Sequence, residues 1–154
     1  MTVTFDDILA ARDRITGQVD RTPVRYSRRL SQLTGADVWI KFDNLHFTGS
    51  FKERGALNRL LQLTPDERAR GVVAASAGNH AQALAYHGGR LGIPVTIVMP
   101  EGTPFVKIDG TRQHGANVVI KGLDFSGSTE EAHRLRDEEG FIFVSAFDDE
   151  GIVA

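Results

Sequence analysis

A lysine lies at the start of a predicted helix in the segment Thr48–Ala56. Lys52 falls within the first turn of this helix, which we expect to run from Ser50 to Leu63. The positive end of the helix dipole disfavours a further positive charge, so this position lowers the pKa of the lysine. A neutral amine is what Schiff-base formation requires. An exposed lysine at a frayed helix start explains the motif equally well when the motif is taken alone.

A second motif, Ser76–Gln82, joins a predicted buried strand directly to a helix. Ligands of parallel α/β sheets bind at the carboxyl ends of the strands. Gly78 lets the backbone approach a ligand closely, and the N–H groups that open the helix can hold an anion such as a carboxylate. Ser76, Asn79 and His80 add side-chain hydrogen-bonding groups. The alternative is a tight turn in which Asn79 is a simple helix cap.

Alternating apolar and helical segments are expected to hold these two motifs in place. The apolar, β-branched runs are Val72–Ser76, Val95–Met99, Asn117–Ile120 and Phe141–Ala146. The helical segments between them are Asn79–Leu91, Pro104–His114 and Ser126–Glu139, each followed by a glycine. Near-continuous apolar strands that alternate with helices are typical of βαβ units. The sequence therefore predicts an α/β protein with an open parallel sheet and flanking helices.

Shorter elements precede this alternation. Thr4 and Asp7 form the start signature of a helix that Gly17 ends. The other expected elements are a helix over Ser27–Leu33, a strand over Asp37–Asp43 and a short helix beginning at Thr64-Pro65. Trp39, on the expected strand, is interpreted as a core residue.

The composition excludes several classes of protein. The chain of 154 residues is 41% apolar and 25% charged, with a net charge of -2 and no cysteine. Scattered basic residues argue against a nucleic-acid or membrane-surface partner. No signal peptide or apolar run of bilayer length is visible, which favours a cytoplasmic protein. The five histidines show no metal-ligand spacing, so no metal site is predicted; they are His46, His80, His87, His114 and His133.

The segments Lys41–Ala56 and Ser76–Gln82 together resemble the two N-terminal signatures of the fold-type-II pyridoxal-phosphate (PLP) enzymes. Within this tryptophan synthase β-like group they are most similar to the threonine dehydratases. Further similar segments are Thr22–Ser27, Met99–Gly102 and Lys107–Ala116. The resemblance covers nearly the whole chain in order, and the Ser-Phe-Lys and Ser-Ala-Gly-Asn-His motifs are specific when they occur together.

The resemblance implies a role for each motif residue. Lys52 would form the Schiff base with PLP, Phe51 would pack against the cofactor ring, and Asn79 would bond the phenolic oxygen of the cofactor. The loop that grips the substrate carboxylate, largely through backbone N–H groups, would consist of Ser76, Ala77, Gly78, Asn79 and His80.

The implied reaction is β-elimination of water from L-threonine or L-serine, which gives a 2-oxo acid and ammonia in isoleucine biosynthesis or threonine catabolism. Ala77 stands where the related serine racemases carry a serine that acts as second acid/base, and His80 stands where the cysteine synthases carry threonine. Both departures disfavour racemisation and β-replacement, the alternative enzyme reactions. A non-catalytic fragment that keeps the fold without the cofactor is the third alternative.

The resemblance also implies a division of the chain into domains. Residues 1–54 would contribute to a large PLP domain, 55–146 would form a small α/β domain, and 147–154 would begin the return into the large domain. The glycine-rich loop for the cofactor phosphate would follow Ala154, so these residues would supply the Schiff-base lysine without the phosphate site. A homo-oligomer with a small amino acid as substrate is the implied assembly.

Overall fold

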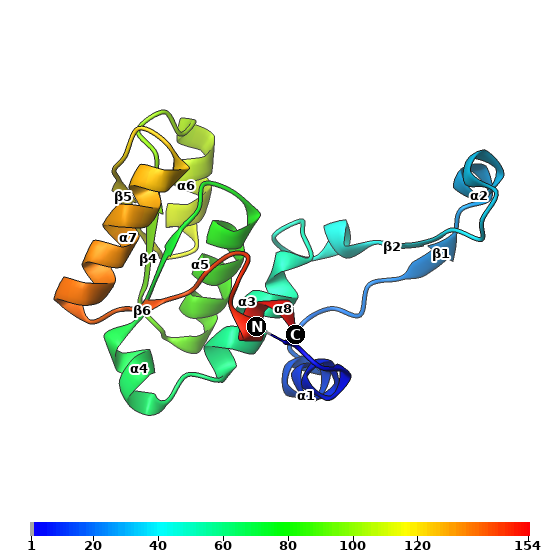
Figure 1. The fold of residues 1–154 in the computed structure, drawn as a ribbon, viewed down its shortest axis with the longest axis horizontal. Helices are drawn as coiled ribbons and strands as arrows, with labels where there is room; N and C mark the ends of the chain where they lie inside the picture. The colour runs from blue at the N-terminus through cyan, green and yellow to red at the C-terminus, as the bar shows by residue number, and fades with distance from the viewer. Residues whose placement is uncertain (1) are drawn as a thin grey trace.

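The computed structural model describes residues 2–154 and contains a parallel four-stranded sheet. The strands follow one another in the order β5-β4-β3-β6 (Figure 1). Their bounds are β3 Val72–Ala75, β4 Val95–Met99, β5 Asn117–Ile120 and β6 Ile142–Phe143. The α/β class and the parallel sheet expected from the sequence are therefore confirmed. The last strand is shorter than the expected Phe141–Ala146, because its pairing with β3 joins only two residues of each strand.

Helices cover both faces of this sheet, as Figure 1 shows. Helices α3 (Lys52–Leu61), α5 (Asn79–Leu91) and α6 (Phe105–Gln113) lie on one side, and α7 (Phe125–Glu139) lies on the other. Residues along the strands alternate between two apolar clusters. Ala74 and Ile97 face the α3 and α5 side, whereas Val73 and Val98 pack against α7. This alternation follows from the two-residue period of a strand.

The N-terminal part of the chain begins with α1 (Phe5–Ile15), whose capping box joins Thr4 and Asp7 as expected. An antiparallel hairpin follows, and it extends away from the sheet (Figure 1). The hairpin comprises β1 Val24–Tyr26, α2 Arg28–Thr34 and β2 Trp39–Lys41, and a 3-10 turn, η1, covers Asp43–Leu45. The strand over Val24–Tyr26 was not expected from the sequence.

The interpretation of Trp39 as a core residue is wrong. Its side chain is 63% exposed and meets Tyr26 edge-on, with 5.4 Å between the ring centroids. Because the hairpin has only two strands and no third layer packs on it within residues 2–154, its aromatic residues cover only each other.

Two short helices complete the fold. Helix α4 (Pro65–Arg70) has the expected proline start and a capping box between Thr64 and Glu67. Helix α8 (Glu150–Val153) packs on α3, where the Asn58 side-chain amide donates to the carbonyl oxygen of Gly151 at 2.7 Å. Within the described residues, every helix is too short or too polar to cross a membrane.

Candidate active site

The candidate site lies at the carboxyl edge of β3 and β6, which are neighbours in the sheet. The loop Ser76–His80 leaves β3 there, and the segment Val144–Phe147 leaves β6. The backbone N–H of Val144 donates to Val73 at 2.9 Å, so the two segments leave the sheet side by side. The expectation that the second motif sits at the carboxyl end of a buried strand is confirmed, since all four residues of β3 are buried.

Lys52 reaches this edge from the first residue of α3. Its Nζ donates to the carbonyl oxygen of Ala146 at 2.7 Å. The same nitrogen lies 5.6 Å from the centre of the Phe51 ring and 5.4 Å from that of Phe147. Partial burial of the amine lowers the pKa of Lys52, in the direction expected from the sequence. The amine therefore gives up its proton more readily than an exposed lysine does.

His80 ties the start of α5 to the segment that follows β6. Its ring is 3% exposed, and Nε2 lies 3.2 Å from the carbonyl oxygen of Val144. Burial is the largest cause that lowers the pKa of His80 to about 4, so the ring is neutral at pH 7. A carbonyl oxygen only accepts, so Nε2 carries the ring hydrogen and Nδ1 is an acceptor. Nδ1 is buried and has no partner within residues 2–154.

The loop between β3 and α5 presents free backbone donors. Ser76 Oγ accepts from the N–H groups of Gly78 and Ala81, at 3.3 and 3.2 Å, which fixes the turn. In the described chain, the N–H groups of Ala77, Asn79 and His80 donate no hydrogen bond. A Cβ added at Gly78 meets no atom within 4 Å, so the loop surface is open there. Unpaired N–H groups at a helix N-terminus suit a bound carboxylate.

Of the other residues selected from the sequence, Phe51 and Asn79 are exposed and Ala77 is partly buried. Phe51 precedes α3 as its N-cap and is 62% exposed. Asn79 is the first residue of α5, is exposed, and makes no side-chain hydrogen bond within residues 2–154. Ala77 packs partly against the apolar cluster beneath the loop. The structure therefore places Lys52 and the Ser76–His80 loop at the same edge of the sheet.

Sequence reasoning missed the contribution of the segment after β6. Val144 and Ala146 supply the carbonyl oxygens that hold His80 and Lys52, and Phe147 supplies one of the two rings near the amine. The available signal was the parallel sheet itself. Residues that directly follow a predicted strand must gather at the same edge as those that follow its neighbours.

The chain is similar to proteins of one family. The sequence model of the family described as pyridoxal-phosphate dependent enzyme matches residues 15–154. L-threonine ammonia-lyase of Thermotoga maritima is 45% identical over 152 residues, which make up 99% of this chain and 38% of that protein. The chain thus spans less than half the length of this curated relative.

Two solved structures superpose on nearly the whole chain. The processed form of threonine deaminase isoform 2 from Solanum lycopersicum has a TM-score of 0.85 and 37% identity, covering 96% of this chain and 40% of that one. Serine racemase from Dictyostelium discoideum has a TM-score of 0.90 and 33% identity, covering 99% and 50%. Because the family match extends over residues 15–154, this chain belongs to the pyridoxal-phosphate dependent enzymes.

Proposed function

We propose that this chain supplies the Schiff-base lysine and the substrate-carboxylate loop of an enzyme that eliminates water from L-threonine or L-serine. The products are a 2-oxo acid and ammonia. The observation that carries the proposal is the placement of the Lys52 amine at the same sheet edge as the unpaired N–H groups of the Ser76–His80 loop. An enzyme that holds an amino acid against an aldehyde cofactor needs an amine to bind the cofactor and an anion-binding loop to bind the substrate carboxylate.

The residues at this edge fit pyridoxal phosphate. The half-buried amine of Lys52 suits the aldehyde of the cofactor, and the rings of Phe51 and Phe147 offer apolar surfaces close to that amine. Buried polar atoms without a partner in residues 2–154 lie on the neighbouring segments; they include Ser50 Oγ and His80 Nδ1. Unpaired buried polar groups are costly, which is consistent with partners that a ligand provides. Phe51 and Asn79 are proposed to hold the cofactor ring.

The chemistry that the cofactor supplies, when bound, is withdrawal of electrons from the Cα of the amino acid. The role we assign to the free Lys52 amine is to take the proton from that Cα, which requires the neutral form that partial burial favours. The carbonyl oxygen of Ala146 orients the amine. The N–H groups of Ala77, Asn79 and His80 bind the substrate carboxylate. The neutral ring of His80 holds this loop beside the segment that follows β6, through its contact with Val144.

Elimination is favoured over racemisation by the residue at position 77. Racemisation needs a second proton donor on the opposite face of Cα, and the methyl group of Ala77 holds no proton to give. The relative at 45% identity is named for its action on L-threonine, which supports threonine as a substrate. The TM-score of 0.90 with a serine racemase keeps racemisation as the second candidate.

The division of the chain into two domains is part of the proposal. Residues 1–54 and 147–154 belong to the large domain, and 55–146 form the small domain. In support, the N-terminal hairpin has no hydrogen bond to the four-stranded sheet within residues 2–154, whereas all four strands of that sheet lie between residues 72 and 143. A homo-oligomer is the proposed assembly.

The proposal is tested in the natural gene product that contains this chain. The protein is incubated with PLP, reduced with borohydride, and the modified peptide is mapped by mass spectrometry. The expected result is one phosphopyridoxyl group on Lys52, with 2-oxobutyrate formed from L-threonine and pyruvate from L-serine. Appearance of the D-amino acid in place of the 2-oxo acid supports racemisation. Absence of an adduct on Lys52 refutes the enzyme proposal and leaves the non-catalytic alternative.

A further inference from the structure

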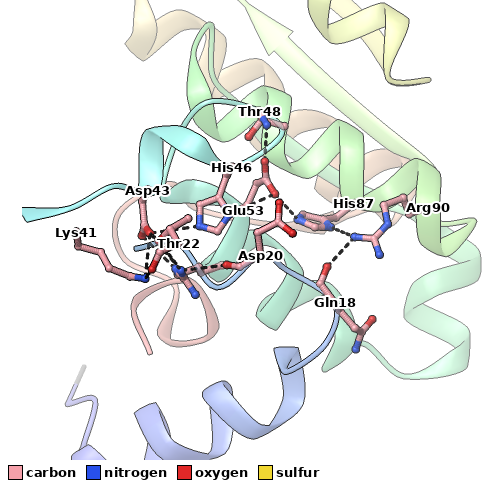
Figure 2. Close-up of polar contacts among 11 residues, drawn as sticks. Gln18, Asp20, Thr22, Lys41, Asp43, His46, Thr48, Glu53, His87 and Arg90 are labelled. Carbon is pink, nitrogen blue, oxygen red and sulfur yellow. Dashed lines mark hydrogen bonds and ion pairs between the residues drawn. The ribbon is translucent and has the colours of Figure 1, made fainter. Parts of the chain in front are cut away.

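The residue after Lys52 points into a buried polar cluster that the proposed reaction does not use. Glu53 is 3% exposed, and two buried histidines flank its carboxylate: His46, which is 3% exposed, and His87, which is fully buried (Figure 2). His46 belongs to the loop before α3 and His87 to the end of α5. With Thr48 and Arg90, these three residues are here named the Glu53 cluster.

Arg90 determines which nitrogen of His87 carries the ring hydrogen. Its Nη1 lies 3.1 Å from His87 Nδ1, and a guanidinium only donates, so Nδ1 accepts. Burial and then the charge of Arg90 lower the pKa of His87 to about 4, and the ring is neutral at pH 7. The hydrogen therefore resides on Nε2, which lies 3.8 Å from Glu53 Oε2. Arg90 is itself held by the carbonyl oxygen of Gln18, at 3.1 Å.

Both oxygens of the Glu53 carboxylate face the loop that leads to Lys52. The backbone N–H of Thr48 donates to Oε1, and His46 Nδ1 lies 4.0 Å from Oε2, the oxygen that also faces His87. The second nitrogen of His46 lies 3.4 Å from Asp43, whose carboxylate is paired with Arg54 at 3.1 Å. The groups that face Glu53 from the loop and from α5 are therefore an N–H donor and two imidazole rings (Figure 2).

Helix α3 begins without a side-chain cap, and the carboxylate of Glu53 bonds the preceding loop rather than the helix start. The N-cap of α3 is Phe51, which has no side chain able to bond the helix start. The carboxylate of Glu53 instead reaches back from the second position of the helix to the N–H of Thr48. A buried carboxylate that bonds the backbone on the far side of Lys52 restricts the four residues in between, including Lys52 itself.

We propose that Glu53 is a positioning residue for Lys52, and that Arg90 assists it by fixing the His87 tautomer whose N–H faces the carboxylate. This inference rests on the proposed function of Lys52. It assigns to the cluster the task of holding the loop 46–51 so that the amine stays at the sheet edge, beside the carbonyl oxygen of Ala146.

The test compares Glu53→Leu with Asn58→Leu, a matched control on the same helix. Asn58 is 1% exposed and bonds Gly151, on the side of α3 that contacts α8, with no bond to the loop before Lys52.

Three rates are measured: borohydride trapping of PLP on Lys52, acetylation of the Lys52 amine without cofactor, and hydrogen exchange of the Thr48 amide. Glu53→Leu is expected to slow trapping about tenfold or more, since small displacements of a reacting group have effects of this order. It should also alter the acetylation rate and speed Thr48 exchange, whereas Asn58→Leu lowers the melting temperature and leaves all three rates unchanged.

A second variant covers the case in which Glu53→Leu does not fold. Arg90 is exposed at the end of α5, so Arg90→Met keeps the core intact. Nitrogen-15 NMR of His87 is expected to show hydrogen on Nε2 alone in the wild type and on both nitrogens, in exchange, in Arg90→Met, with slower trapping at Lys52. Trapping and acetylation rates equal to those of the wild type in both variants would overturn the inference. Failure of the wild type to be trapped refutes the proposed function instead, and the acetylation rates then decide the positioning role by themselves.

Discussion

The side-chain amine of Lys52 lies 2.7 Å from the carbonyl oxygen of Ala146, 94 residues further along the chain. This contact joins the first turn of α3 to the segment that follows β6. Two residues earlier, the carbonyl oxygen of Val144 accepts from the ring of His80, the second residue of α5. One short segment thus fixes both the amine and the neutral imidazole, and this explains how motifs separated in sequence form one site.

Lys52→Met is expected to abolish the PLP adduct and turnover while it changes the free energy of unfolding by no more than about 1 kcal/mol. The methionine keeps the length of the side chain, and a single half-buried hydrogen bond contributes about 0.5–1.5 kcal/mol, offset by the cost of desolvating the amine. Lys41→Met is the matched control, because Lys41 Nζ also donates to a carbonyl oxygen, that of Thr22, away from the site. Urea denaturation and adduct mapping check both variants, and a wild-type turnover rate in Lys52→Met would contradict the assignment.

Stability is expected to fall as the pH drops from 6.5 toward 4. His80 and His87 both have their pKa lowered from 6.5 to about 4 in the folded state. Between these values the unfolded chain binds protons that the folded chain does not, so acid favours unfolding. Each histidine contributes on the order of 3 kcal/mol to this loss, which is complete below pH 4. Urea denaturation at pH 8, 6.5, 5.5 and 4.5 measures it.

Asp43 does not interfere with this test, because it titrates at a lower pH than the two histidines. The hydrogen bond from Arg54 lowers the pKa of Asp43 to about 2. Its contribution is lost only as the pH falls from about 3.8 toward 2. In the double variant His80→Gln and His87→Gln, the dependence between pH 6.5 and 4.5 should largely disappear. A slope that persists in this variant would show that other groups cause it.

Much of the fold was predictable because its signals are local. The capping boxes at Thr4 and Thr64 and the bounds of Asn79–Leu91 follow from side chains within a few residues of one another. The order of strands and helices follows from apolar periodicity, and the parallel sheet follows from that order. The exposure of Trp39 was not predictable in this way, since an apolar residue on a strand is buried only if another layer covers it.

The Glu53 cluster was missed although Glu53 and His87 lie on the buried stripes of their helices. Glu53 precedes Ala56 and Leu60 at spacings of three and seven residues, and all three are buried on α3. On α5 the buried residues His80, Leu84 and His87 follow one another at spacings of four and seven residues from His80. A polar residue on an apolar stripe indicates a buried partner, but the partner comes from another helix, so the spacing within one helix does not identify it.

Asn79→Ala is expected to weaken cofactor binding and to misalign the bound cofactor. The free energy of unfolding should change by no more than about 0.5 kcal/mol, as is usual for an exposed side chain without a partner. The amide is proposed to bond the phenolic oxygen of PLP, so its loss should shift the visible absorbance of the adduct and raise the dissociation constant of the cofactor. Asn117→Ala, at the start of β5 on the opposite edge of the sheet, is the control. Identical spectra and affinities in Asn79→Ala and the wild type would refute this role.

Gly55→Ala is expected to destabilise the protein, although alanine favours a helix over glycine. Gly55 lies in α3 where α8 crosses it, and a Cβ there would stand 2.3 Å from the carbonyl oxygen of Ile152. That oxygen belongs to the backbone, so the two helices must separate. Overpacking of this kind costs about 1–3 kcal/mol, which exceeds the gain of about 1 kcal/mol in helix propensity.

Gly110→Ala isolates the propensity term from the packing term. Gly110 also lies inside a helix, α6, but a Cβ there meets no atom within 4 Å. This variant should therefore gain about 0.5–1 kcal/mol in the free energy of unfolding. Thermal and urea denaturation measure both changes, and equal stability changes in the two variants would mean that α8 does not pack on α3.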